Sequence, residues 1–290
     1  MTPTPVGQHL PRTGHGPTEH GPRVDRRSRA RDWSEIQERM LVPLYEAVYE
    51  RLDVGPATRL LGLGCGAGLA LLMAASRGAA VTGVDTSSDR LAHARERLLP
   101  AGRNPRVRGH ADARIVDGSP GAVRADPAGY TVVTAFEPIG CLAGDAEDLG
   151  GLLAEATPLA GRGAAVVLTG WGPAERCATA SVLRVATRLA EPVRGTGNWR
   201  PAHRDDLEQV ARRAGLRPDG SGRVACPFGY ADVDSAVRGL LSTGLFDPAI
   251  ATTDQVQVNK ELAEALHPYQ RQDGTVWMPN VFRYLIARTP

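Results

Sequence analysis

The chain of 290 residues has very little lysine: Lys260 is the only one among 34 basic residues, and the others are arginine. With 33 glycines and 22 prolines, this bias is typical of a GC-rich genome. Aromatic residues are scarce as well, at 5%, and the formal net charge is only +2. So small a net charge argues against nucleic acid or an anionic membrane as the main partner.

Cysteines and long apolar runs are also few. No two cysteines form a C-x-x-C pattern and none lies at a zinc-like interval from a histidine, so we expect no metal site. The longest uncharged run, 60–76, has 17 residues and is crowded with glycines, and no signal-peptide core follows the N-terminus. We therefore expect a cytoplasmic protein with four reduced thiols. These are Cys65, Cys141, Cys177 and Cys226.

The first 31 residues differ from the rest of the chain. They hold six arginines and two acids, a net charge of +4, which leaves −2 for residues 32–290. They also contain five prolines and almost no large apolar side chain, so we predict a disordered arm. The whole chain is 42% hydrophobic and 23% charged, which is typical of a globular protein with one large domain.

Beyond residue 31, the apolar pattern predicts four parts. Residues 32–56 have helical spacing with a break near Pro43, and we predict an N-terminal helical lid. Residues 57–229 alternate strands with helices, which predicts a mostly parallel, doubly wound α/β sheet. Residues 230–272 are expected to be an inserted helical cap, and 273–290 to hold the last strand. Strands are predicted at 80–85, around Val107 up to Asp112, at 130–136, 163–169 and 222–228, and helices at 69–76, 88–99, 147–156, 174–189, 204–214, 233–241 and 255–266.

A glycine-rich loop follows the first predicted strand and precedes a helix. Gly62, Gly64, Gly66 and Gly68 alternate in it, so the backbone can approach a ligand closely. Asp85 stands 17 residues past the last glycine, at the end of the second predicted strand. A carboxylate at this place can accept hydrogen bonds from both ribose hydroxyls of an adenosine.

Two classes of cofactor fit the loop. The pattern G-x-G-x-x-A at 62–67 satisfies a dinucleotide fingerprint, and G-x-G-x-G at 64–68 fits a nucleoside sulfonium. A short-chain dehydrogenase would need a Tyr-x-x-x-Lys pair, but Val256 stands four residues before Lys260. Asp112, placed after the predicted third strand, also favours the sulfonium.

The sequence here resembles the class I S-adenosylmethionine-dependent methyltransferases, in particular their small-molecule branch in natural-product pathways. The similar segments are 60–68 (LLGLGCGAG), 84–85 (VD), 109–113 (GHADA), 130–136 (YTVVTAF), 273–274 (DG) and 279–284 (PNVFRY). The resemblance covers about residues 32–290. It implies a Rossmann-like sheet whose last strand is antiparallel, with S-adenosylmethionine as cofactor and S-adenosylhomocysteine as product.

The resemblance also implies which residues form the site. Cofactor contacts are expected from Gly62, Gly64, Cys65, Gly66, Gly68, Asp85, Thr86, Asp112, Ala113 and Phe136. Glu137, after the fourth predicted strand, is the candidate general base. Aromatic side chains expected to wall the substrate pocket are Trp33, Tyr45, Tyr49, Trp171, Phe228, Tyr230 and Phe246. A mostly apolar cap favours a hydrophobic small-molecule acceptor.

Three positions depart from the family pattern. Gly62 replaces an acid that helps to hold the methionine end of the cofactor, Thr131 stands in place of a Phe-Asp pair, and Glu137 replaces an Asn or a small residue. A substitute carboxylate could come from Glu137 or from Glu35 and Glu38. These departures keep two alternatives to methyl transfer open, namely a repurposed enzyme for cyclisation, rearrangement or elimination, and a non-catalytic binding subunit. The attacked atom (O, N or C) and the choice between monomer and homodimer stay open.

Overall fold

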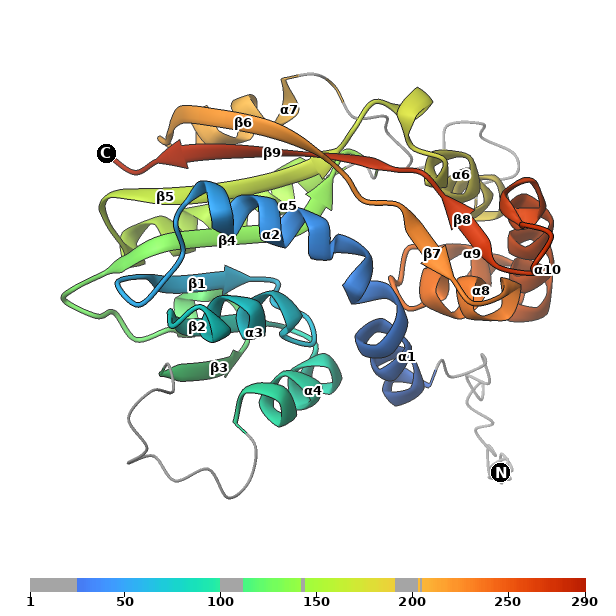
Figure 1. Ribbon diagram of the computed structural model, residues 1–290, viewed down its shortest axis with the longest axis horizontal. Helices are drawn as coiled ribbons and strands as arrows, with labels where there is room; N and C mark the ends of the chain where they lie inside the picture. The colour runs from blue at the N-terminus through green and yellow to red at the C-terminus, as the bar shows by residue number, and fades with distance from the viewer. Residues whose placement is uncertain (1–24, 100–111, 142–143, 191–202, 204) are drawn as a thin grey trace, which may run out of the picture.

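The computed structural model describes residues 25–99, 112–141, 144–190, 203 and 205–290. The described residues form a seven-stranded sheet (Figure 1). Its spatial order is β3 (Ala113–Asp117), β2 (Ala80–Asp85), β1 (Arg59–Leu63), β4 (Tyr130–Ile139), β5 (Ala160–Trp171), β9 (Val281–Arg288) and β6 (Arg217–Ala225). The last strand, β9, runs antiparallel to both neighbours, and the pairs from β3 to β5 are parallel. The predicted mostly parallel sheet with an antiparallel last strand is confirmed.

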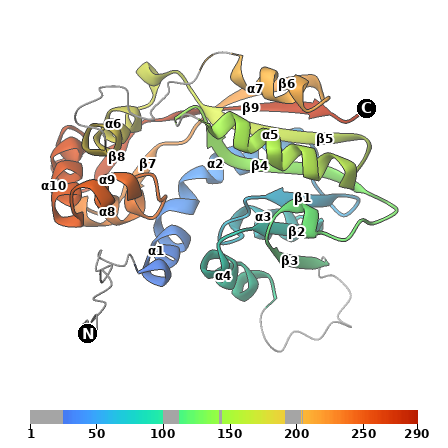
Figure 2. The ribbon, with the colours of Figure 1, turned by 180° about the vertical axis from the view of Figure 1, so that it is seen from behind.

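The sheet is covered on both faces because its strands are apolar on both sides. Leu60 of β1 and Val132 of β4 join one core with α2 (Val42–Arg51) and α3 (Leu69–Ser76), whereas the next residues along each strand join the other core. There α5 (Asp145–Ala156) and α7 (Asp206–Arg213) lie against the sheet, as Figure 2 shows. The carboxyl ends of β1, β2 and β4 therefore meet at one edge, where a ligand can bind.

The third strand differs from its prediction. We expected a strand around Val107 that ends near Asp112, but the strand is Ala113–Asp117, and residues 100–111 lie outside the described residues. The register pairs Asp117 with Asp85 at the carboxyl end of β2, so Asp112 lies at the opposite end of the strand. A single valine between polar residues was too weak a signal to set this register.

The N-terminal lid begins earlier than predicted. Asp25 caps α1 (Arg26–Asp32), so ordered structure reaches into the predicted arm, of which 1–24 lie outside the described residues. A π-helical turn over Trp33–Gln37 and a 3₁₀ turn over Glu38–Leu41 connect α1 to α2. Pro43 lies in the first turn of α2, which confirms the predicted break, because proline is tolerated there but not inside a helix.

The cap contains the two predicted helices, α8 (Val233–Leu241) and α10 (Gln255–Leu266), and a shorter one, α9 (Asp247–Thr252). It joins the sheet through a small antiparallel two-stranded sheet of β7 (Phe228–Tyr230) and β8 (Val276–Met278), which the sequence did not predict. Helix α6 (Thr179–Ala190) packs against α9 and α10, and α1 lies between the cap and α4 (Ser88–Leu98) in Figure 1. No helix in the described ranges is long and apolar enough to span a bilayer.

Candidate functional site

The glycine-rich loop leaves β1 at the carboxyl edge of the sheet and leads into α3. Gly64, Gly66 and Gly68 have φ of 58°, 56° and 82°, a left-handed conformation that disfavours any side chain. The N–H of Cys65 donates to the carbonyl of Val84 over 3.0 Å and so ties the loop to β2. The loop backbone is thus held in place at the edge where the ends of the strands meet.

Asp85 ends β2 beside this loop. Its Oδ2 accepts a hydrogen bond from the N–H of Gly66 and its Oδ1 accepts one from the N–H of Ser87, both over 2.8 Å. Each carboxylate oxygen can accept further bonds, so ribose hydroxyls can still reach it. Thr86 is exposed directly after it. The structure places Asp85 beside the loop, as the sequence predicts.

Asp112 and Ala113 do not lie at this edge, so their assignment as adenine contacts is wrong. Asp112 precedes β3 and pairs with the exposed Arg114, about 16 Å along the chain from the carboxyl end of the strand. Asp117 occupies that end and stands next to Asp85. The signal that could have identified Asp117 is the glycine after it, Gly118, whose φ of 120° marks the exit from a strand.

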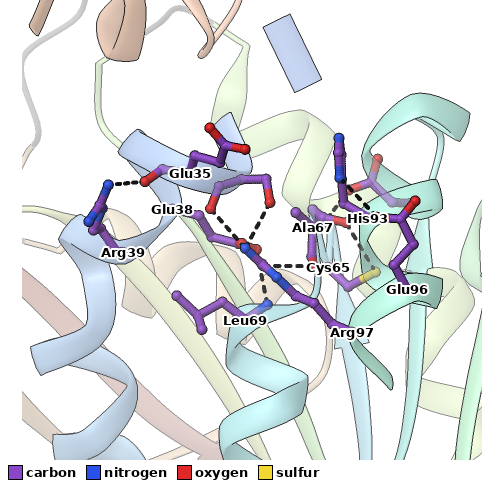
Figure 3. Close-up of polar contacts among 12 residues, drawn as sticks. Glu35, Glu38, Arg39, Cys65, Ala67, Leu69, His93, Glu96 and Arg97 are labelled. Atoms are coloured by element: carbon purple, nitrogen blue, oxygen red, sulfur yellow. Dashed lines mark hydrogen bonds and ion pairs between the residues drawn. The ribbon is translucent and has the colours of Figure 1, made fainter. Parts of the chain in front are cut away.

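Glu38 of the lid lies over the start of α3. Its side chain is only 3% exposed; it accepts a hydrogen bond from the N–H of Leu69 over 3.2 Å and pairs with Arg97 of α4 over 2.5 Å (Figure 3). Arg97 also donates to the carbonyls of Ala67 and Ser34, each over 2.8 Å. Burial raises the pKa of Glu38, and Arg97 counteracts this rise. One arginine therefore joins the lid, the loop and α4.

Glu38 thus brings a carboxylate to the loop, as one of the suggested substitutes for the acid missing at position 62. Glu35, the other suggested lid residue, pairs with Arg31 instead, and its side chain is 56% exposed. Glu38 is already paired with Arg97, however, so its charge is largely compensated. Glu137, the other suggested substitute, also lines the loop cavity and can face a positive group there.

Trp33 covers the loop from the lid side. A Cβ added at Gly66 would lie 2.9 Å from its indole Nε1, and this nitrogen is buried without a hydrogen-bond acceptor among the described residues. The guanidinium of Arg90 stacks over the indole, 4.1 Å from its centroid, and donates to the carbonyl of Ser242 in the cap. A cavity of only about 40 Å³ remains between loop and lid. A buried donor without an acceptor indicates a place for a ligand oxygen.

The missing acid at position 62 has a packing cause. A Cβ on Gly62 would lie 2.9 Å from Cδ2 of Leu71, and one on Gly83 of the neighbouring strand would lie 2.4 Å from Cδ1 of the same leucine. Leu71 is fully buried and fills the space above both glycines. Gly68 is likewise needed for packing, since its Cβ would lie 2.9 Å from Cβ of Ala94.

Replacing Gly62 by aspartate should therefore destabilise the protein. We expect Gly62→Asp to lower the free energy of unfolding by about 1–3 kcal/mol, because the new side chain collides with Leu71 in a full core. Urea unfolding measures this loss. Gly150→Asp is the control, since open space surrounds Gly150 on α5, and its change should stay below about 1 kcal/mol. Equal midpoints for Gly62→Asp and the parent would contradict the packing explanation.

Glu137 lies in β4 where two cavities meet. It lines both the loop cavity and a larger one, and a Cβ on Gly64 would lie 3.4 Å from its Oε2. Its side chain is exposed by surface area, and it opens into both cavities. The protein atoms around the carboxylate still desolvate it and raise the pKa of Glu137; Arg90 opposes this rise and Asp85 adds to it. A carboxylate with a raised pKa is suited to accept a proton.

The larger cavity has a volume of about 280 Å³ and lies between the sheet, the lid and the cap. Its walls are mostly apolar, and they include three of the predicted aromatic residues, Trp33, Trp171 and Phe228. The rings of Trp171 and Phe282 lie 4.6 Å apart. The sequence did not single out several further wall residues: Gln37, Leu41, Asp145, Asp148, Thr179, Leu183, Leu240, Thr243, Leu245 and Phe282.

Four of the predicted pocket aromatics lie elsewhere. Tyr45 lines the loop cavity, where its ring lies 4.7 Å from that of Phe136. Tyr49 is fully buried and donates to the carbonyl of Ala70. Tyr230 is buried behind Gln37, and Phe246 is fully buried in the core. These last three side chains pack in the protein core and do not line the larger cavity.

The residues at the loop fit S-adenosylmethionine. Asp85 can accept the ribose hydroxyls, Gly64 and Gly66 leave the backbone open, and the unpaired indole N–H of Trp33 can donate to a carboxylate. The cavity between loop and lid is too small, since a ligand of this size needs roughly 300 Å³ or more, so Trp33 must turn aside. The described residues include no cluster of His, Cys, Asp or Glu arranged to hold a metal.

Comparison with known proteins agrees with this fold. Residues 60–155 match the family described as "Methyltransferase domain". A candidate methyltransferase from Bacillus halodurans has a similar structure, with a TM-score of 0.52, 13% identity and coverage of 85% of this chain and 98% of that one. YjhP from Escherichia coli has a TM-score of 0.51, 18% identity and coverage of 91% and 100%. No curated protein matches in sequence. The predicted class I methyltransferase fold is confirmed.

Proposed function

We propose that this chain, which has the class I S-adenosylmethionine-dependent methyltransferase fold and a methyltransferase domain at 60–155, methylates a hydrophobic small molecule. The observation that carries the proposal is the position of Glu137. It stands between the cavity beside the glycine-rich loop and an apolar cavity of about 280 Å³. A nucleophile in the second cavity can thus meet a methyl group in the first.

S-adenosylmethionine supplies a methyl group that is already activated for displacement. The protein's own residues then have to align the acceptor, exclude water and accept a proton where the acceptor loses one. The aromatic and aliphatic walls of the larger cavity orient the acceptor, and Trp33 and Leu41, which line both cavities, close the junction from the lid side. Glu137 is the group that accepts the proton. Asp85 and the loop backbone hold the cofactor.

Cofactor binding should move Trp33, which gives a direct test. We expect S-adenosylhomocysteine to bind in titration calorimetry and to change the tryptophan fluorescence, because the indole must leave Gly66. Trp33→Phe should abolish most of the fluorescence change and weaken binding about 5- to 50-fold, since a charge-assisted hydrogen bond is lost. Trp277→Phe, at an exposed site away from both cavities, is the matched control.

Two results would count against methyl transfer. Absence of S-adenosylhomocysteine binding to the parent protein would contradict the cofactor assignment itself. Binding without transfer of a labelled methyl group to any pathway substrate, together with product formation, would favour the repurposed enzyme. The observation in favour of that second candidate is the pairing of Glu38 with Arg97, which leaves Glu137 to face the cofactor's ammonium instead of the acceptor. The presence of an apolar cavity next to the loop counts against the third alternative, a non-catalytic binding subunit.

A further inference from the structure

One residue of α4 holds the indole of Trp33 over the glycine-rich loop. The guanidinium carbon of Arg90 lies 4.1 Å from the centre of the indole ring, and its Nη2 donates to the carbonyl of Ser242 over 2.9 Å. A guanidinium over the face of an indole is attracted to the ring. Because Ser242 follows α8 directly, the cap fixes the place of the guanidinium, and the guanidinium fixes the place of the indole.

The indole N–H of Trp33 is not satisfied in this position. It is buried and has no acceptor among the described residues. A Cβ added at Gly66 would lie 2.9 Å from the same nitrogen, so the indole fills the space directly above the loop. A buried donor without an acceptor costs free energy, which other contacts of the ring have to offset. The contact with Arg90 therefore helps to keep the indole over the loop.

The backbone beside Trp33 is held separately from its side chain. Arg97 donates to the carbonyl and to the hydroxyl of Ser34, each over 2.8 Å. On the other side, α8 packs closely against this turn of the lid, since a Cβ on Gly239 would lie 3.0 Å from Cγ2 of Ile36. The lid backbone is thus held between α4 and the cap, and the indole is the part that can move.

The contact between Arg90 and Trp33 borders both cavities. Trp33 lines the loop cavity and the larger cavity. Thr243 and Leu245, which follow the carbonyl that Arg90 bonds, line the larger cavity. Movement of the indole therefore opens the loop cavity and changes the wall of the larger cavity at the same time.

We propose that Arg90 is a positioning residue that latches Trp33 over the loop, so that release of the indole from Arg90 limits how fast the cofactor enters. With the indole in place, the cavity between loop and lid has about 40 Å³, which is too small for the cofactor. The indole therefore leaves Arg90 before the cofactor reaches Gly66. The inference rests on the proposed function for the identity of the cofactor and goes further in naming the contact that controls its entry.

The test is stopped-flow tryptophan fluorescence of the full chain mixed with S-adenosylhomocysteine. Because release of the indole is a step within one molecule, the observed rate should reach a plateau as the ligand concentration rises. Arg90→Leu removes the charge and the hydrogen bond to the cap, and it should raise this plateau about tenfold. Arg90→Lys keeps a charge and a donor but loses the flat guanidinium, so its plateau should lie between the other two.

Arg95→Leu is the matched control, because it makes the same change on the same helix at a residue that lines neither cavity. Its plateau should equal that of the parent. An observed rate that rises linearly without a plateau in the parent, or an unchanged plateau in Arg90→Leu, would overturn the latch. Weaker binding of S-adenosylhomocysteine to Arg90→Leu at an unchanged plateau would instead make Arg90 a direct cofactor contact.

Urea unfolding shows whether Arg90→Leu is folded. If it is not, Arg90→Gln, which also lacks the charge, takes its place with the same expected rise of the plateau. The proposed function fails separately, when S-adenosylhomocysteine does not bind to the parent protein at all.

Discussion

Replacing Glu137 by glutamine is expected to lower kcat by about 10²- to 10⁴-fold, the usual contribution of a positioned general base. The amide keeps the shape of the side chain at the junction of the two cavities but cannot accept a proton. In the parent protein, activity should fall as the pH drops through the pKa of Glu137, which desolvation by the surrounding protein holds above the usual range for glutamate. The variant should lose this acid limb of the pH–rate profile.

A binding measurement separates this role from a structural one. The affinity of Glu137→Gln for S-adenosylhomocysteine should stay within about threefold of the parent value, because Asp85 and the loop backbone still hold the nucleoside. Glu147→Gln is the matched control, because it makes the same change at an exposed position that lines neither cavity, and it should keep both kcat and the acid limb. An unchanged pH profile in Glu137→Gln would disprove the base. A large loss of cofactor affinity with little loss of kcat would instead assign Glu137 to the cofactor's ammonium.

Much of the fold could be predicted from the sequence because the apolar periodicity of most segments matches the helix or strand that they form. Strand β2 and helices α3, α8 and α10 have the predicted bounds, since each has a clear apolar period between glycine, proline or aspartate boundaries. Strand β3 was misplaced because its sequence, ARIVD, is only half buried and lies at the sheet's edge. The two-stranded sheet of β7 and β8 was missed because its strands have three residues each.

The candidate site was predictable where it is contiguous in sequence. The glycine loop follows β1, Asp85 is the last residue of β2 and Glu137 lies near the end of β4. The carboxyl ends of parallel strands lie side by side, so their positions along the chain predicted that they meet. The cavity beyond them was not predictable, because Gln37, Asp145 and Phe282 come from the lid, the start of α5 and β9. Thr131 departs from the family pattern, but it has a structural role: its Oγ1 accepts a hydrogen bond from the backbone N–H of Arg59 over 2.9 Å.

Replacing Arg97 by alanine is expected to lower the free energy of unfolding by about 3–5 kcal/mol, because it leaves the buried Glu38 carboxylate without its partner. The loss should depend on pH. Burial already raises the pKa of Glu38 in the folded protein, so this group's contribution to stability falls as the pH rises through that pKa. Without Arg97 the pKa of Glu38 rises further, so the loss of folding stability continues to higher pH. The difference from the parent, measured by urea unfolding, should thus be smallest in acid and largest near neutral pH.

Two further variants test whether the unpaired charge of Glu38 causes the loss of stability in Arg97→Ala. Arg188→Ala breaks an exposed arginine–glutamate pair with Glu261 and should cost less than about 1 kcal/mol, with little dependence on pH. Adding Glu38→Gln to Arg97→Ala removes the unpaired charge, so the double variant should be more stable than Arg97→Ala alone at neutral pH. If the double variant is instead less stable, the arginine acts mainly through its bonds to the carbonyls of Ser34 and Ala67. The lid would then be held to the loop by hydrogen bonds to backbone carbonyls, and the stability difference from the parent would not depend on pH.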